Sequence, residues 1–349
     1  MGALTPAPAR RGASAVLAGY LLAGLVVLAA SIAVCITFGP ADLSVPDVYA
    51  VVLEHLGLGQ AQVSRIKDGI VWELRLPRTL LAAVCGAGLA LCGTIMQSLL
   101  RNPLADPFVL GISSGASTGA VLVVVLGVGA GAVSLSAGAF GGALVSFALV
   151  MLLAAGAGGG TSRVVLAGVA GTQLFSALTS FIVISSADAE QTRGVLFWLL
   201  GSLSGTDWTD VVICASVTLT GLVVCWTQAS ALDAFTFGDS SAAALGISVR
   251  WVRVALFGIT ALITAVLVSA AGAIGFVGLV LPHAARLLVG PGHRSLLPVA
   301  ALAGAIFLVW VDALARTFFA PAEIPIGVVT ALIGVPAFAL ILFRMRGRR

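Results

Sequence analysis

A motif that could carry nucleophilic chemistry lies in the first third of the chain, at Gly111-Ile-Ser-Ser-Gly115. It matches the G-x-S-x-G pattern of serine hydrolases, in which a strand-to-helix turn exposes the serine to a histidine partner. Here the motif lies within an apolar run that predicts helix, not strand. The three histidines, His55, His283 and His293, have no evident geometric relation to Ser113. We therefore interpret the motif as small residues that let two helices pack closely.

Residues for ATP hydrolysis or metal binding are also sparse. Lys67 is the only lysine, and no glycine-rich loop precedes it, so the phosphate-binding Walker A motif is absent. His283 has no second histidine, cysteine or carboxylate at metal-ligand spacing, and the five cysteines form no CxxC pair. The sequence therefore predicts a chain that is not an enzyme and binds no cofactor of its own.

The composition indicates what kind of fold must position these residues. Of the 349 residues, 60% are hydrophobic and only 9% are charged, whereas a soluble domain carries about 25% charged residues. Water would solvate so uncharged a surface poorly, so lipid must be the solvent for much of it. The basic residues are scattered singly between apolar runs, which does not predict a nucleic-acid surface. Because the composition never shifts, we expect a single membrane domain over residues 1–349.

Stretches without Asp, Glu, Lys or Arg mark the expected membrane spans, each of which needs about 20 apolar residues. These stretches are 12–41, 79–100, 107–162, 164–187, 211–232, 254–285, 295–311 and 324–343. Two of them are too long for one helix, and each contains a break rich in glycine and other small residues, at 127–136 and 270–275. Dividing both gives ten spans and predicts an all-α polytopic membrane protein.

The distribution of basic residues predicts the orientation of these spans. With ten spans both termini share one side, and that side would hold twelve arginines, against six basic residues on the other. The positive-inside rule then places the N-terminus (1–11) and the basic tail (344–349) in the cytoplasm. On the opposite side, Ser44-Val-Pro-Asp47 has the pattern of a helix start, so a short surface helix is expected over 45–55.

The source of energy for transport can also be considered from the sequence. Ion-driven carriers usually bury carboxylates in the middle of the membrane. Only Asp312, near the outer end of the ninth span, comes close here, and the other span interiors are almost free of ionisable groups. The sequence therefore predicts that another subunit supplies the energy. An ion-coupled carrier or channel that works alone is the alternative.

Three stretches resemble the FecCD family, the membrane subunits of importers for iron-siderophores, haem and cobalamin. They are Arg75-Leu-Pro-Arg78 through Gly93-Thr-Ile-Met-Gln97 and Asn102-Pro-Leu-Ala-Asp-Pro107 to Gly115; Gly272-Ala-Ile-Gly-Phe-Val-Gly-Leu-Val-Leu-Pro-His283 with Arg286; and Glu323-Ile-Pro-Ile-Gly-Val-Val-Thr330 with Gly334 and Pro336. They occur in the family's order, and the resemblance covers almost the whole chain after the first span.

The resemblance implies a type II ABC importer permease fold, with ten helices in two structurally related halves of inverted topology. It also implies a second permease subunit (another copy or a paired homologue), two cytoplasmic ATPases that bind ATP and magnesium, and a periplasmic or lipid-anchored substrate-binding protein. The expected location is a bacterial cytoplasmic (inner) membrane. The expected cargo is an iron chelate, with a ferric siderophore favoured and haem or cobalamin as alternatives.

In similar transporters, arginines at the outer ends of the second and ninth spans pair with glutamates of the binding protein. Arg75, Arg78 and Arg316 match these places. The rigid guanidinium fork of arginine can bind a carboxylate through two hydrogen bonds, which suits such docking. The alternative is that these side chains only extend to the membrane interface.

The expected cytoplasmic loop 233–253 resembles the coupling helices that fit a cleft on each ATPase. The residues that this resemblance assigns to ATPase coupling are Phe237, Gly238, Asp239, Ser240, Ala244, Leu245 and Gly246. We expect a short helix that Asp239 or Ser240 caps and that Gly246 ends. A plain amphipathic connector is the alternative.

Polar residues in and before the fifth span (164–186) are candidates for the transport path. Those within the span are Gln173, Ser176, Thr179 and Ser180. They would give a large ligand weak polar contacts, as a path that must release what it admits requires. Thr161 and Ser162, in the expected turn before the span, match the place where similar importers narrow the cytoplasmic end of the path.

Overall fold

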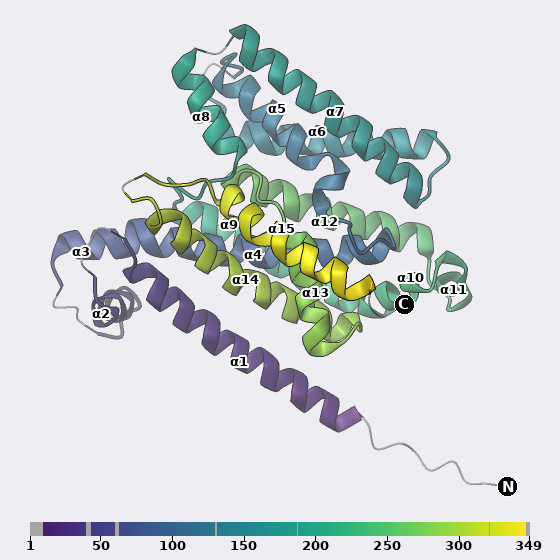
Figure 1. The fold of residues 1–349 in the computed structure, drawn as a ribbon, viewed down its shortest axis with the longest axis horizontal. Coiled ribbons are helices and arrows are strands. Elements are labelled where there is room, and N and C mark those ends of the chain that lie inside the picture. Colours follow the sequence, from purple (N-terminus) through teal and green to yellow (C-terminus); the bar gives the residue numbers. More distant parts are fainter. Residues whose placement is uncertain are drawn as a thin grey trace.

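The computed structural model describes residues 10–39, 43–59, 63–129, 131–186, 188–320 and 322–346, and this part of the chain is helical without a strand (Figure 1). In chain order the helices are α1 (Arg10–Thr37), α2 (Val45–His55), α3 (Arg65–Gly69), the π-helix η1 (Ile70–Arg75), α4 (Leu76–Leu99), the 3-10 helix η2 (Pro107–Leu110), α5 (Ile112–Val124), α6 (Leu135–Gly156), α7 (Thr161–Ser186), α8 (Ala189–Leu199), α9 (Trp208–Thr227), α10 (Ala229–Thr236), α11 (Asp239–Ala244), α12 (Val249–Ala271), α13 (Val277–Val289), α14 (His293–Thr317) and α15 (Ile326–Arg346). The terminal segments 1–11 and 344–349 lie largely outside the described residues, so their side of the membrane stays a prediction.

Within the described residues, the ten expected apolar runs correspond to ten apolar helices, although the run 211–232 also includes the start of a further short helix. Seven are long and apolar enough to cross a membrane, namely α1, the continuous helix formed by α3, η1 and α4, and α6, α7, α9, α12 and α14. Three shorter apolar helices, α5, α13 and α15, occupy the remaining runs. The prediction of an all-α protein with many apolar helices is therefore confirmed, while the count of ten spans stays a prediction.

The two expected breaks within long apolar runs are confirmed. Between α5 and α6 the chain turns, and α6 restarts after Ser134, whose hydroxyl oxygen accepts a hydrogen bond from the Ala137 N–H at 3.1 Å. The other break follows α12, where Gly272 has a φ of 68°. This left-handed backbone conformation is one that glycine adopts without strain.

The short helix expected over 45–55 is also confirmed as α2. Its first turn is closed reciprocally: the Asp47 N–H donates to the Ser44 hydroxyl at 3.2 Å, and the Ser44 N–H donates to the Asp47 carboxylate at 3.1 Å. The same carboxylate accepts a hydrogen bond from Lys67 at 3.0 Å, which ties α2 to α3. The imidazole of His55 stacks on Trp72 of η1 with ring centroids 4.0 Å apart. These contacts hold α2 against the long helix formed by α3, η1 and α4, near its N-terminal end.

One expected span ends in the wrong place. The apolar run 211–232 predicts a single helix, but α9 ends at Thr227 and α10 begins at Ala229, after Gln228. Counting charged residues does not reveal this break, because Thr227-Gln228-Ala229-Ser230 is polar but uncharged. Beyond the break α10 packs against α4, where the Ser98 hydroxyl donates to the Leu232 carbonyl at 2.9 Å.

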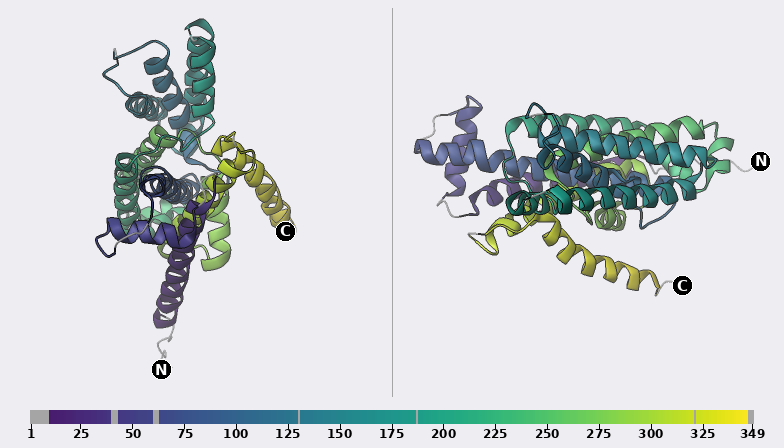
Figure 2. Two further views of the ribbon diagram at one scale, coloured as in Figure 1. Left: turned by 90° about the vertical axis from the view of Figure 1, so that its left-hand side faces the viewer. Right: turned by 90° about the horizontal axis from the view of Figure 1, so that it is seen from above.

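The central element of the larger helix bundle is α4, which contacts α1, α9, α12, α13 and α14 (Figures 1 and 2). It meets two of these neighbours backbone to backbone. A Cβ atom added at Gly86 would lie 2.1 Å from the carbonyl oxygen of Gly304 in α14, and one added at Gly93 would lie 1.9 Å from that of Gly278 in α13. Such contacts leave no room for a side chain, so glycine determines how closely these helices approach.

A second group of helices, α5, α6 and α7, packs beside this bundle, with α8 against it (Figure 1). The G-x-S-x-G residues hold this group together. A Cβ atom added at Gly115 would lie 2.3 Å from the Cβ of Ser146 in α6, and the Ser146 hydroxyl donates to the Gly111 carbonyl at 2.8 Å. The interpretation of the motif as helix packing is therefore confirmed.

Several helices expose long apolar faces, α15 and α7 among them. Helix α15 diverges from the bundle toward its C-terminal end (Figure 2) and exposes Leu332, Leu340 and Phe343. Helix α7 exposes Phe181 and Ile184 in the same way. Apolar faces of this size need either lipid or another apolar protein surface.

The replacement Gly86→Ala should lower stability, because the added methyl group must displace the Gly304 carbonyl. Overpacking of this kind costs roughly 1–3 kcal/mol of unfolding free energy. The control is Gly258→Ala in α12, where nothing lies within 4 Å of the added carbon. There the higher helix propensity of alanine should be neutral or stabilising. Thermal unfolding in detergent measures both variants, and equal midpoints would contradict the close approach of α4 and α14.

Candidate functional site

Three arginines predicted from the sequence converge at one end of the bundle, called here the arginine end. Arg75 closes η1 and is 8% exposed, and its Nη1 donates to the Ile36 carbonyl at 2.7 Å. Arg316 of α14 donates from Nη2 to the Cys35 carbonyl at 3.1 Å. The last carbonyls of a helix have no partner within the helix. Both arginines therefore stabilise the C-terminal end of α1.

The carboxylate of Asp312, which is fully buried, lies between two of these arginines. Arg78 of α4 donates from Nε to Asp312 Oδ1 at 2.9 Å, and Arg316 Nε lies 3.0 Å from Oδ2. The contact with Arg316 is an ion pair without good hydrogen-bond geometry. Asp312 thus links α4 to α14 at the arginine end.

A second carboxylate, that of Glu323, reaches the same cluster from the segment between α14 and α15. Arg78 Nη1 lies 3.0 Å from Glu323 Oε1 and 3.1 Å from Oε2, and the Ser204 hydroxyl donates to Oε2 at 2.8 Å. Partial burial raises the pKa of the Glu323 carboxyl, but hydrogen bonds and charge from Arg78 offset this, so that pKa lies below its usual value. Glu323 was noted in the sequence only as part of a family motif, and no local pattern indicates its distant partners.

A cavity of about 700 Å³ opens at the arginine end. Its polar lining includes Arg75, Arg78, Arg316, Glu323 and Ser204. The three guanidinium groups are therefore mostly enclosed and hydrogen-bonded within the protein, and do not extend freely to a membrane interface. Their role in docking a partner stays a prediction.

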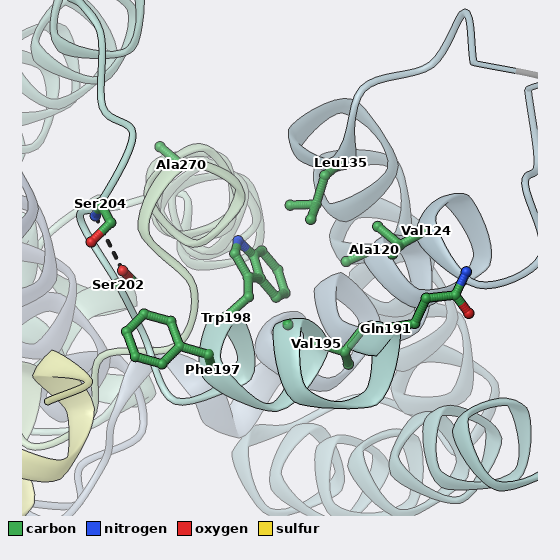
Figure 3. Close-up of a pocket in the computed structure, with 11 residues that line it drawn as sticks. Ala120, Val124, Leu135, Gln191, Val195, Phe197, Trp198, Ser202, Ser204 and Ala270 are labelled. Atoms are coloured by element: carbon green, nitrogen blue, oxygen red, sulfur yellow. Dashed lines mark hydrogen bonds between the residues drawn. The ribbon is translucent and has the colours of Figure 1, made fainter. Parts of the chain in front are cut away.

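A second cavity, of about 350 Å³, lies between α8, α12 and the ends of α5 and α6. Figure 3 shows the indole of Trp198 and the side chains of Val195 and Gln191 on the α8 side, facing Leu135 and Ala120 across it. Ser204 lines both cavities. The sequence does not indicate this cavity, because α8 is a short helix outside the expected spans.

Backbone atoms join three chain segments at the same end of the molecule. The Gly327 N–H of α15 donates to the Leu200 carbonyl at 3.0 Å, and the Ser202 N–H donates to the Ala271 carbonyl at 2.9 Å. A Cβ atom added at Gly272 would lie 2.2 Å from a backbone carbonyl oxygen of α8. We call this contact between the segments after α8, α12 and α14 the backbone joint.

The path residues predicted on α7 are not all exposed. The exposed residues are Gln173, Ser176 and Ser180. Thr179 is buried against α5, where its hydroxyl lies 2.8 Å from that of Thr118. Thr179 lies at the edge of the helical face that the other three positions share, and it packs inside the protein while they are exposed.

The structure also corrects the setting of Thr161 and Ser162. Both were expected in a turn before the fifth span, but they are the first two residues of α7. Three glycines with positive φ, at 158–160, form the turn before them. Their part in narrowing a path is not tested by this position.

At the opposite end of the bundle, called here the α11 end, α10 and α11 form the element for which coupling to an ATPase is predicted, and that role stays a prediction. The residues assigned to coupling occupy α11 and the turns on either side of it. Gly246 has a φ of 79° and ends the helix as predicted. Ala242 is buried beneath the helix, whereas Phe237 and Leu245 are 81% and 72% exposed. The helix therefore presents two large apolar side chains away from the protein.

The expected cap of this helix is wrong. The N-cap position is Gly238, with no side-chain hydrogen bond, and neither Asp239 nor Ser240 caps α11. Instead the Asp239 carboxylate forms an ion pair with Arg253 of α12. This hydrogen bond lowers the pKa of the Asp239 carboxyl, so the pair persists at neutral pH. A charged partner in the next helix outcompetes a local backbone N–H for the carboxylate.

A second contact fixes the coupling element to α14. The imidazole Nδ1 of His293 lies 2.6 Å from Asp233 Oδ1 of α10, and the His293 N–H donates to the same oxygen at 2.9 Å. Together with the pair formed by Asp239 and Arg253, this contact attaches α10 and α11 to two long helices. The α10–α11 element is therefore held to α12 and α14 by side-chain contacts.

In the described residues, seven helices long and apolar enough to cross a membrane and three shorter apolar helices indicate a multi-pass membrane protein. Within the same residues, no group of three or more histidine, cysteine or acidic side chains could hold a metal ion.

Known proteins identify the family. The FecCD transport family matches residues 26–344. YvrB of Bacillus subtilis (strain 168), an uncharacterized ABC transporter permease, is 39% identical over 340 residues, which cover 95% of both chains. The hemin transport permease HmuU of Yersinia pestis is 40% identical over 284 residues, covering 80% of this chain and 85% of its own. The cobalamin import permease BtuC of Halobacterium salinarum is 42% identical over 280 residues, covering 78% and 73%.

A solved structure agrees with these relatives. A metal-chelate type ABC transporter in an inward-facing conformation superposes with a TM-score of 0.82 at 30% identity, covering 93% of this chain and 98% of the other. This chain belongs to the FecCD transport family. The suspected family resemblance is thus confirmed.

The replacement Asp312→Asn should destabilise the protein, because it leaves the charges of Arg78 and Arg316 without their buried partner. Removing one member of a buried ion pair costs roughly 3 kcal/mol of unfolding free energy. The double variant Asp312→Asn with Arg316→Gln should recover part of this loss. Thermal unfolding of the two single variants and the double variant in detergent measures the coupling, and strictly additive effects would show that the two side chains do not interact.

Proposed function

We propose that this chain is the membrane permease subunit of an ATP-driven importer that carries an iron chelate, a ferric siderophore, across a bacterial cytoplasmic membrane. The observation that carries the proposal is the convergence of Arg75, Arg78 and Arg316 on one cavity. Against these three positive charges stand only Asp312 and Glu323, so the described cluster keeps a net positive charge. Such a mouth favours an anionic cargo, as many ferric chelates are.

Relatives support the class of cargo. HmuU is named for hemin, BtuC for cobalamin, and the superposed structure for a metal chelate. All three names concern a metal held in a large organic ligand. Haem and cobalamin are accordingly the alternatives to a ferric siderophore.

The proposed complex contains a second permease subunit, two ATPases and a substrate-binding protein. The exposed apolar faces of α7 and α15 offer surfaces for the second permease, and Phe237 and Leu245 at the α11 end offer contacts for an ATPase. The arginine end would face outward and receive the binding protein. This arrangement includes ten spans in two inverted halves, with both termini in the cytoplasm.

The proposed mechanism is alternating access. ATP and magnesium bound by the partner subunits would close the two ATPases and move α11. Because Asp239 and Asp233 attach this element to α12 and α14, the movement would reach the helices that carry Asp312 and the backbone joint. An ion-coupled carrier has less support, since Asp312, its best carboxylate, is enclosed by two arginines.

Reconstitution in lipid vesicles tests this function. Uptake of a labelled ferric siderophore should require the permease, its ATPase, the binding protein and ATP together. An ATPase variant that binds but does not hydrolyse ATP is the control and should abolish accumulation. Uptake by the permease alone, or uptake that survives the inactive ATPase, would contradict the proposal.

The replacement Leu245→Asp should weaken the association with the ATPase, because it places a charge in an apolar contact. Disrupting a buried apolar contact at an interface commonly lowers the binding affinity about tenfold or more, and each factor of ten corresponds to about 1.4 kcal/mol. Leu58→Asp is the matched control, since Leu58 is 73% exposed and Leu245 is 72% exposed. Co-purification of the ATPase with each variant is the measurement, and equal retention would remove Leu245 from the interface.

A further inference from the structure

Arg78 has two carboxylate partners that differ in their access to solvent. Its Nε is bonded to Asp312, which is fully buried, and its Nη1 is bonded to Glu323, whose side chain is 36% exposed. A partner protein cannot reach Asp312 without opening the helix bundle. It can reach Glu323 from the cavity. Arg78 therefore has one permanent partner and one exchangeable partner.

The way Glu323 binds Arg78 also leaves room for exchange. Both carboxylate oxygens lie within 3.1 Å of a single nitrogen, Nη1. A parallel pair of hydrogen bonds to two guanidinium nitrogens would be the stronger arrangement. The carboxylate of Glu323 thus binds one nitrogen of the Arg78 guanidinium, Nη1, and not two.

The other two arginines at this end use carbonyl groups as their hydrogen-bond partners. Arg75 donates to Ile36, and Arg316 donates to Cys35. Among the described residues, no carboxylate pairs with Arg75. The carboxylate partner of Arg316 is the buried Asp312. An external carboxylate that enters the cavity therefore meets three guanidinium groups, and it competes with one internal carboxylate, that of Glu323.

We propose that Glu323 occupies the partner's binding position on Arg78 in the free permease, and that docking replaces it with a carboxylate of the partner protein. This inference rests on the proposed role of Arg75, Arg78 and Arg316 in docking. The exchange breaks the contact of Glu323 with Arg78 and leaves its contact with Ser204, 2.8 Å away. It thereby removes the contact that joins the segment before α15 to α4.

Two consequences follow from the exchange. Because docking must displace Glu323, the free energy of the contact between Glu323 and Arg78 is subtracted from the partner's binding free energy. Docking is therefore weaker than it would be if Arg78 had no internal partner. When the partner leaves, Glu323 returns and neutralises Arg78 again. The internal carboxylate therefore favours a partner that binds reversibly.

The test is the affinity of the binding protein that restores uptake in the reconstituted system, measured on the complete transporter in lipid nanodiscs. Glu323→Gln should tighten binding about tenfold, equivalent to about 1.4 kcal/mol, because the amide competes poorly for Arg78. The matched control is Glu190→Gln on α8, an exposed acid outside both cavities. It loses the same charge and should leave the affinity within twofold.

The outcomes separate the exchange from docking itself. Arg75→Gln should weaken binding; if it does not, the docking role fails and the exchange fails with it. If Arg75→Gln weakens binding but Glu323→Gln leaves it unchanged or weaker, docking stands and the exchange is wrong. Equal tightening by Glu323→Gln and Glu190→Gln would assign the effect to overall charge and also overturn the exchange.

Discussion

A buried carboxylate between two guanidinium groups is the interaction on which the arginine end depends. Asp312 cannot be reached by water, so its charge is tolerated only because Arg78 and Arg316 lie beside it. These side chains come from α4 and α14, which already touch through glycine. Since Arg316 also binds the end of α1 and Arg78 binds Glu323, one buried charge organises four chain segments. These contacts join the segments that line the cavity.

The contrast between the two ends of the bundle is physically informative. At the arginine end, contacts are ionic and converge on an enclosed carboxylate. At the α11 end, an ion pair attaches α11 to α12 and a hydrogen bond attaches α10 to α14, while the apolar side chains of Phe237 and Leu245 are exposed. Helix α4 lies between them and contacts α13 and α14 backbone to backbone.

Much of the helical layout could be predicted from the sequence, because apolar runs and glycine-rich breaks are local signals. The limits of α2 follow from Ser44 and Asp47, and the end of α11 follows from Gly246. One failure depended on a distant partner, because Asp239 pairs with Arg253 instead of capping its helix. The other is the break at Gln228, where polar but uncharged residues interrupt a run that was defined by the absence of charge. The family resemblance predicts that the three arginines lie at the same end of the protein. No pattern in a single sequence predicts that Glu323 pairs with one of them.

The backbone joint has a consequence for how this protein can change over evolutionary time. Its hydrogen bonds connect main-chain groups, such as Gly327 with Leu200 and Ser202 with Ala271, so they do not depend on which side chains surround them. Neighbouring cavity residues such as Trp198 and Gln191 can be replaced while the scaffold stays registered. A lineage can thus change the residues that line this cavity and keep the same backbone framework, provided that the small residues of the joint are retained.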